Sequence, residues 1–120
     1  MNSIIKDFEK FCKTPNRNSG KASSYAHAIK YLCEFLKIEE INKQTVKQIQ
    51  DIELLIKDNK SSLYKEMLEF LSDRGQTSYL VNGFIKAALP LFFRFYSYYS
   101  ETVEVNDMQK KHYHFTRIKR

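Results

Sequence analysis

Five stretches of the chain place apolar residues at the spacing of an amphipathic helix. In the clearest one, apolar positions recur at i, i+3, i+4, i+7, i+8 and i+11, while His27, Lys30 and Glu34 fall outside them. This periodicity gathers the apolar side chains on one side of a helix, which can then be buried. The pattern predicts helices within residues 3–13, 21–37, 45–57, 62–72 and 75–99.

Turn-forming and capping residues separate these stretches. Pro15 ends the first helix inside the polar segment 14–20, because proline cannot continue a helix past its own position without losing a hydrogen bond. Thr45 and Gln48, three residues apart, match a capping box in which Thr45 is the first residue of the third helix's cap. A hydroxyl at Ser61–Ser62 would cap the fourth helix, and Gly75 can adopt the left-handed conformation that ends it.

The stretch 75–99 is the element around which we expect the others to pack, because its end is apolar on two sides. Phe92 and Phe95 lie on one side of such a helix, whereas Phe93 points elsewhere. A helix with two apolar sides must be covered by the other helices, by a neighbouring domain or by a second copy.

Pro90 and the end of the chain complete the predicted organisation. Pro90 lies inside the last helical stretch, so we expect a kink there. Residues 101–107 contain threonine and valines typical of extended chain, and we interpret them as a strap or linker. The sequence thus predicts a helical domain over residues 1–100 and a basic tail or linker over residues 101–120.

The composition agrees with an all-α protein. The chain is 42% hydrophobic but has only three glycines and two prolines, which is enough apolar residue for a core and too few turn residues for a β-sandwich. We expect a small orthogonal bundle of about five helices that ends in a long kinked helix. Cys12 and Cys33 fall at apolar helical positions and are expected as buried thiols in a cytoplasmic protein without membrane contact.

Positive charge is concentrated in two windows. Lys and Arg number 20 against 14 Asp and Glu, a net charge of +6, and neither the window from Lys10 to Lys30 nor that from Lys110 to Arg120 contains an acidic residue. The first window spans a loop and a helix start, where cationic side chains and the positive helix end suit phosphate binding. A solvated basic loop is the alternative. The second window could follow a nucleic-acid backbone or be a solvated end.

Two segments carry a resemblance to known families. One is Ser-Ser-Tyr-Ala-His-Ala-Ile at residues 23–29, and the other is Ala-Leu-Pro-Leu-Phe-Phe-Arg-Phe-Tyr at residues 88–96. Together with the order of the helices, they resemble the SAM-like core-binding domain of phage integrases and other tyrosine recombinases. They are equally similar to the helical N-terminal module that precedes the nuclease domain in some HNH-type restriction enzymes. The resemblance covers roughly residues 4–99.

The resemblance implies a module that grips duplex DNA mainly through its backbone, in recombination or restriction. The catalytic half of a recombinase has no room in 120 residues, and Pro90 is not a feature that the family requires. The positions that carry over from the resemblance are Lys21, Ser23, Ser24, His27, Arg74, Gln76, Thr77, Ser78 and Lys86. The basic window adds Lys13 and Arg17. His27 is also compatible with a plain surface histidine.

The motifs of catalysis and of cofactor binding are missing from the sequence. It contains no glycine-rich phosphate loop, no nucleophile elbow and no carboxylate cluster beside a histidine. His112 and His114 have no cysteine or carboxylate at the spacing of a metal site. We therefore expect a chain that is not an enzyme by itself and that needs neither metal nor cofactor.

Association through the aromatic end of the last helix is the alternative function. The predicted interface residues are Phe92, Phe95, Tyr96 and Tyr99, for which packing in the core is the competing interpretation. Both functions can hold together, because DNA-binding proteins often dimerise to match two half-sites. The expected partners are thus duplex DNA and either a second copy or a catalytic domain.

Overall fold

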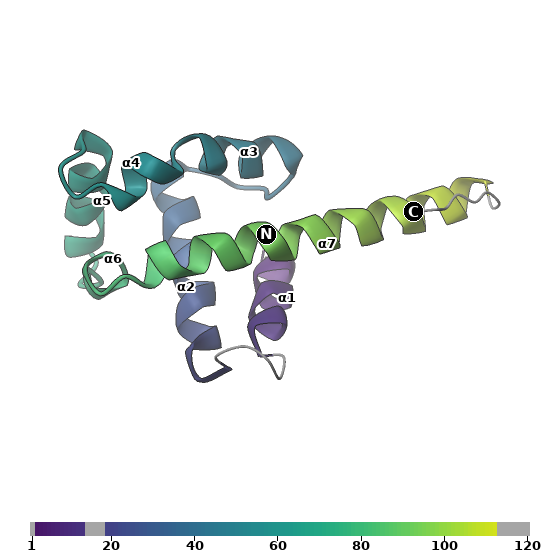
Figure 1. The fold of residues 1–120 in the computed structure, drawn as a ribbon, viewed down its shortest axis with the longest axis horizontal. Coiled ribbons are helices and arrows are strands. Elements are labelled where there is room, and N and C mark those ends of the chain that lie inside the picture. The colour runs from purple at the N-terminus through teal and green to yellow at the C-terminus, as the bar shows by residue number, and fades with distance from the viewer. Residues whose placement is uncertain (1, 14–18, 113–120) are drawn as a thin grey trace.

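The computed structural model describes the backbone of residues 2–13 and 19–112 and the side chains of residues 3–13 and 20–101. This part of the chain is all-α, which confirms the predicted fold class (Figure 1). The elements in order are α1 (Asn2–Cys12), the 3₁₀ turn η1 (Ser19–Lys21), α2 (Ala22–Leu36), α3 (Lys43–Asp51), α4 (Glu53–Lys57), α5 (Ser62–Ser72), α6 (Ser78–Val81) and α7 (Phe84–His112). None of the helices in the described residues is long and apolar enough to cross a membrane.

The core forms where α7 crosses a hairpin made by α1 and α2. These two helices lie side by side and antiparallel, and the first half of α7 crosses both of them (Figure 1). Phe8 of α1, Ile29 and Leu32 of α2, and Leu89 and Phe92 of α7 are all completely buried. The remaining helices extend the core: α4 and α6 contact α7, α5 contacts α2 and α4, and α3 packs next to α4. The predicted central role of the last helix is therefore confirmed.

The third and fifth predicted helices are each divided in two. Ile52 separates α3 from α4, and Gly83, with φ of +83°, separates α6 from α7. A positive φ is accessible to glycine without steric cost, which is why the chain turns at Gly83. The expectation of five helices is corrected accordingly.

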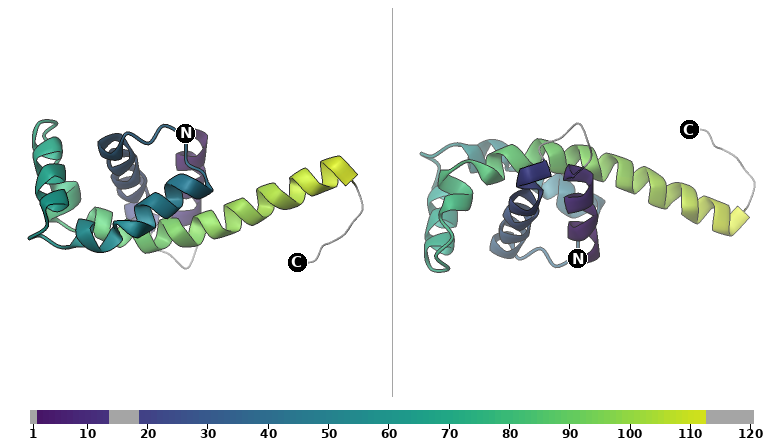
Figure 2. Two further views of the ribbon diagram at one scale, coloured as in Figure 1. Left: turned by 90° about the horizontal axis from the view of Figure 1, so that it is seen from above. Right: turned by 90° about the horizontal axis from the view of Figure 1, so that it is seen from below.

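α7 is longer than the sequence predicts. It continues as one helix through Pro90, whose ring is exposed. The strap or linker expected from residue 101 is helical as far as His112, and the views of Figure 2 show this part of α7 extending past the other helices. The remaining residues of the predicted tail, 113–120, lie outside the described residues. The predicted boundary at residue 100 is therefore not a break in secondary structure.

The start of α3 differs from the predicted capping box by three residues. The side-chain oxygen of Asn42 accepts from the amide of Thr45 at 3.0 Å, and the amide of Asn42 donates to the Thr45 hydroxyl at 2.8 Å. Thr45 is thus the third residue of a capping box rather than its first. The prediction failed because asparagine and threonine both cap helices, so the sequence offers two possible starts.

The predicted boundaries of α5 are confirmed. The Ser61 hydroxyl accepts from the amide of Tyr64 at 3.0 Å, as an N-cap does. After the last turn, Gly75 has φ of +68°, and the next amide, that of Gln76, donates back to the carbonyl of Leu71 at 2.9 Å. This arrangement satisfies a carbonyl at the end of the helix, as a left-handed glycine commonly allows.

Candidate nucleic-acid interface

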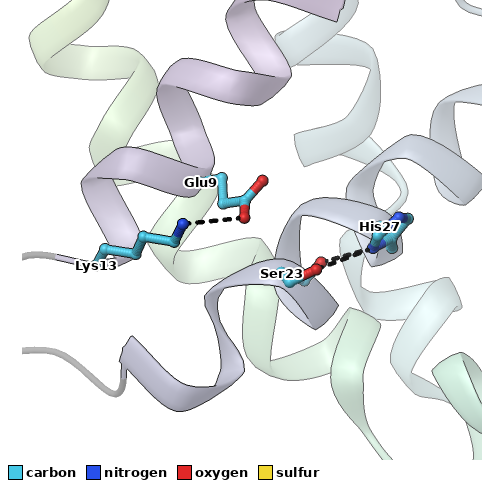
Figure 3. Close-up of polar contacts among 4 residues, drawn as sticks. All are labelled: Glu9, Lys13, Ser23 and His27. Atoms are coloured by element: carbon cyan, nitrogen blue, oxygen red, sulfur yellow. Dashed lines mark hydrogen bonds and ion pairs between the residues drawn. The ribbon is translucent and has the colours of Figure 1, made fainter.

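The lysines of α1 line one exposed side of the helix. Lys6, Lys10 and Lys13 are exposed and follow the i, i+4, i+7 spacing that aligns side chains along a helix. The Nζ of Lys13 lies 3.4 Å from Oε2 of Glu9, in an exposed ion pair (Figure 3). Such surface pairs contribute only about 0–1 kcal/mol, so a phosphate can compete for the Lys13 ammonium.

The start of α2 adds to this basic end of the hairpin. Lys21 is exposed at the end of η1, directly before α2, and the first turn of α2 has no acidic residue and no side-chain cap. Within the described residues, the first turn of α2 therefore contributes no negative charge to offset the positive end of the helix dipole. Ser23 is exposed and Ser24 is half-buried. The predicted site residue Arg17 lies outside the described residues.

Ser23 and His27 form a contact pair one turn apart on α2. The Nδ1 of His27 lies 2.9 Å from the carbonyl oxygen of Ser23 and 3.4 Å from its hydroxyl (Figure 3). Because a carbonyl oxygen only accepts, Nδ1 is the donor in the shorter contact. The nitrogen left for a ligand is then Nε2, which can accept from a donor when the ring is neutral and can donate to a phosphate when the ring is charged.

α6 packs beside His27 and brings part of a second predicted segment to α2. The ring of Tyr79 lies 5.2 Å from that of Tyr31 and 6.4 Å from that of His27, between ring centroids. Gln76 and Thr77, which immediately precede α6, are half-buried. Gln76 and Thr77 therefore lie next to α6, which packs on α2, the helix that carries His27. Neither residue makes a hydrogen bond with Lys13 or Lys21 among the described residues.

Arg74 does not lie at the basic end of the hairpin. Its guanidinium carbon is 3.7 Å from the centre of the Phe70 ring, and its Nη1 donates to the carbonyl of Phe70 at 3.2 Å. Phe70 in turn packs on Phe35, near the C-terminal end of α2, with ring centroids 5.4 Å apart. A helix of this length spans about 20 Å, so Arg74 is at the far end of α2 from Lys21.

Lys86 makes no hydrogen bond or ion pair with the start of α2 among the described residues. It lines a hollow with Lys57, Asp58 and Asn59, on the turn between α4 and α5. The sequence grouped Lys86 with the DNA-binding residues because it follows the turn into the last helix. The structure places Lys13, Lys21, Ser23 and His27 on the α1–α2 hairpin, Arg74 beside Phe70 at the end of α5, and Lys86 on α7 at the hollow.

The predicted aromatic interface is corrected by burial. Phe92 is 0% exposed and Phe95 is 6% exposed, since both pack against Phe8 of α1. Neither ring can line an outer surface of the folded chain. Tyr96 and Tyr99 are half-buried. The exposed member of the group is Tyr98, at 58%, which the sequence analysis missed.

Other exposed apolar side chains come from the shortest helices. Leu54 of α4 is 81% exposed and Val81 of α6 is 61% exposed. Their exposure could not be predicted from the sequence, because helices of four or five residues are too short to show a periodicity. In the part of the chain that the structure describes, no three histidine, cysteine or carboxylate side chains gather as a metal site would require.

Comparisons with known proteins find no relative of this chain. No protein-family model matches it, and neither a curated protein nor a solved structure does. A function can therefore be inferred only from features of this chain. They are an all-α fold, a basic end of the α1–α2 hairpin that exposes Lys10, Lys13 and Lys21, and a polar hollow beside Lys86.

Proposed function

We propose that the chain is a non-catalytic DNA-binding module that grips duplex DNA mainly through phosphate contacts. The observation that supports this most is the basic end of the hairpin. Lys10, Lys13 and Lys21 are exposed there, and the sequence from Lys10 to Lys30 contains no acidic residue. Among these lysines, Lys13 forms an ion pair with Glu9, and this pair lies at the surface of the protein.

The kinds of side chain on this surface favour backbone contacts over base readout. Ammonium groups, the Ser23 hydroxyl, the His27 imidazole and the start of α2 are all groups that bind phosphate oxygens. Lysine acts as a point charge, without the bidentate geometry with which arginine or asparagine distinguishes bases. Binding with little sequence preference is the result that this chemistry supports.

The resemblance of residues 23–29 and 88–96 to tyrosine recombinases and HNH-type restriction enzymes suggests the setting. In such a setting the module would hold DNA beside a catalytic domain or partner protein that supplies the chemistry. A second candidate function is self-association, for which the exposed ring of Tyr98, 6.2 Å from that of Phe11 between centroids, is the supporting observation. Sedimentation of the chain and its Tyr98→Glu variant tests this candidate.

Fluorescence anisotropy with a labelled random-sequence duplex tests DNA binding. The variant Lys13→Glu/Lys21→Glu alters the basic end of the hairpin. The control Lys43→Glu/Lys47→Glu makes the same charge change on α3, where both lysines are also exposed. With about four phosphate contacts, the logarithm of the affinity should fall with the logarithm of salt concentration at a slope of about −3 to −4.

We expect the hairpin variant to lose most of the affinity and the α3 variant to keep most of it. An equal loss in both variants would show that net charge alone attracts DNA, and the proposed surface would then be rejected. The absence of binding at low salt would reject the function itself.

A further inference from the structure

A hollow of about 440 Å³ opens between the α4–α5 turn and the α6–α7 turn. The buried side chains of Ile56 and Leu80 line it, together with the half-buried Tyr64. Its volume lies within the roughly 300–1,000 Å³ that small-molecule sites usually occupy. The exposed lining is mainly polar, and Ile56, Leu80 and Tyr64 supply its apolar part.

Lys86 is the cation of this hollow that is available to a ligand. Lys57 also lines the hollow, but its Nζ donates to Oε2 of Glu53 at 2.7 Å, so its charge is already paired. The Lys86 ammonium has no ion pair or hydrogen bond among the described residues. An ammonium without an internal partner favours an anionic group on a bound molecule.

Asp58 and two amides supply the complementary groups. One carboxylate oxygen of Asp58 accepts from the backbone amide of Lys60 at 2.9 Å, and the other has no partner among the described residues. The side-chain amides of Asn59 and Asn82 also line the hollow and make no hydrogen bond within the described part of the chain. The hollow therefore offers a cation, an anionic acceptor and two groups that both donate and accept.

We propose that this hollow binds a single nucleotide whose base carries an exocyclic amine. The phosphate would lie at Lys86, and the planar base would lie against the half-buried Tyr64. The amine of cytosine or adenine would donate to Asp58, because carboxylates accept from such amines, and the amides would pair with the rest of the base edge. Thymine has a carbonyl oxygen in place of the exocyclic amine of cytosine, so it would set an acceptor against the Asp58 carboxylate. This site is separate from the basic end of the hairpin and does not depend on it.

A titration followed by ¹H–¹⁵N NMR tests the site with dCMP, dTMP, deoxycytidine and inorganic phosphate. We expect dCMP to bind with a dissociation constant of about 1 mM and to shift the amides of residues 57–59 and 82–86. Deoxycytidine lacks the phosphate, dTMP lacks the amine and the Lys86→Ala variant lacks the charge. Each of these changes should weaken binding about tenfold, as removal of one charge-assisted or base-specific contact does. Lys86→Ala is the variant, and Lys65→Ala, at an exposed α5 position outside the hollow, is the control.

Each of three results would overturn the proposal. The first is dCMP leaving the amides around the hollow unshifted. The second is equal binding by the Lys86→Ala and Lys65→Ala variants, whose spectra also report whether each is folded. The third is inorganic phosphate reproducing the dCMP shifts, which would mean that the hollow is an anion site only. Since duplex binding is tested with variants at Lys13 and Lys21, failure of either proposal can be told from failure of the other.

Discussion

The ring of Phe8 meets the ring of Phe92 edge-on, with the centroids 5.3 Å apart and the planes at 88°. Both side chains are completely buried, and Phe8 also contacts Phe95 at 5.6 Å. This contact joins α1 to α7. Because isolated helices as short as the 11-residue α1 are marginal in water, its packing on α7 and α2 is what holds it, and with it the lysines of its outer side.

Replacing Phe8 with alanine should destabilise the fold strongly. The change removes a buried ring and leaves a cavity beside Phe92, which costs about 3–5 kcal/mol in comparable cores. Urea unfolding followed by circular dichroism measures the free energy of unfolding. Lys6→Ala, on the exposed side of the same helix, should change it by less than about 0.5 kcal/mol. A loss below about 1 kcal/mol for Phe8→Ala would contradict the packing described.

Pro90→Ala should stabilise the chain. Proline inside a helix leaves the carbonyl four residues earlier, that of Lys86, without its usual donor, and its ring crowds that turn. Alanine restores the donor, although it also loosens the unfolded chain by about 0.4–1 kcal/mol. The expected net gain is about 2 kcal/mol by urea unfolding. Ser97→Ala, at another exposed position of α7, is the matched control, and an unchanged or lower stability for Pro90→Ala would refute this account.

Local features could be predicted from the sequence where the apolar periodicity was compatible with a single helix orientation. The apolar register of α2 left His27, Lys30 and Glu34 outside the core, and all three are exposed. Exposure of Lys13 and Lys21 could be predicted in the same way, because both lie off the apolar positions of the adjoining helices. Local periodicity is enough for such statements since it depends on neighbouring residues alone.

Features that depend on distant segments could not be predicted. The rings of Phe92 and Phe95 suit a core or an interface equally, and only the position of α1 across α7 decides for the core. The break at Gly83 was hidden inside a continuous apolar pattern. Arg74 was grouped with the start of α2, but its contact with Phe70, which packs on Phe35, places it near the C-terminal end of α2.

The Cys33 thiol should make the stability depend on pH in alkaline solution. Burial raises the pKa of Cys33 from 9.0 to about 12, and the nearby Glu34 carboxylate adds to the rise. Above pH 9 the unfolded chain therefore loses a proton that the folded chain keeps, and stability falls as pH rises from 9 towards 12. Below pH 9 this contribution is fully present.

Urea unfolding at pH 8 and at pH 10 checks this effect in the chain and in its Cys33→Ala variant. The chain should lose about 1 kcal/mol more between the two pH values than the variant, because other titrating groups affect both equally. If the wild-type chain loses the same free energy of unfolding as the Cys33→Ala variant between the two pH values, or loses less, Cys33 does not stay protonated in the folded state.

Glu9→Gln should increase the affinity for duplex DNA. The Glu9 carboxylate lies 3.4 Å from the Lys13 ammonium and is the negative charge that competes with a phosphate for it. Glutamine keeps the size of the side chain but removes the charge. Relief of one exposed pair is worth up to about 1 kcal/mol, so the affinity should rise about two- to fivefold at low salt. The gain should shrink as salt screens the surface.

Asp51→Asn is the matched control for this prediction. Asp51 also pairs with a lysine four residues away, Lys47, at 3.1 Å, and both side chains are exposed on α3. Its change in net charge equals that of Glu9→Gln, but it lies away from the basic end of the hairpin. Anisotropy titrations should therefore show a rise for Glu9→Gln alone. An equal rise in both variants would assign the effect to net charge, and no rise in either would mean that Lys13 does not contact the DNA.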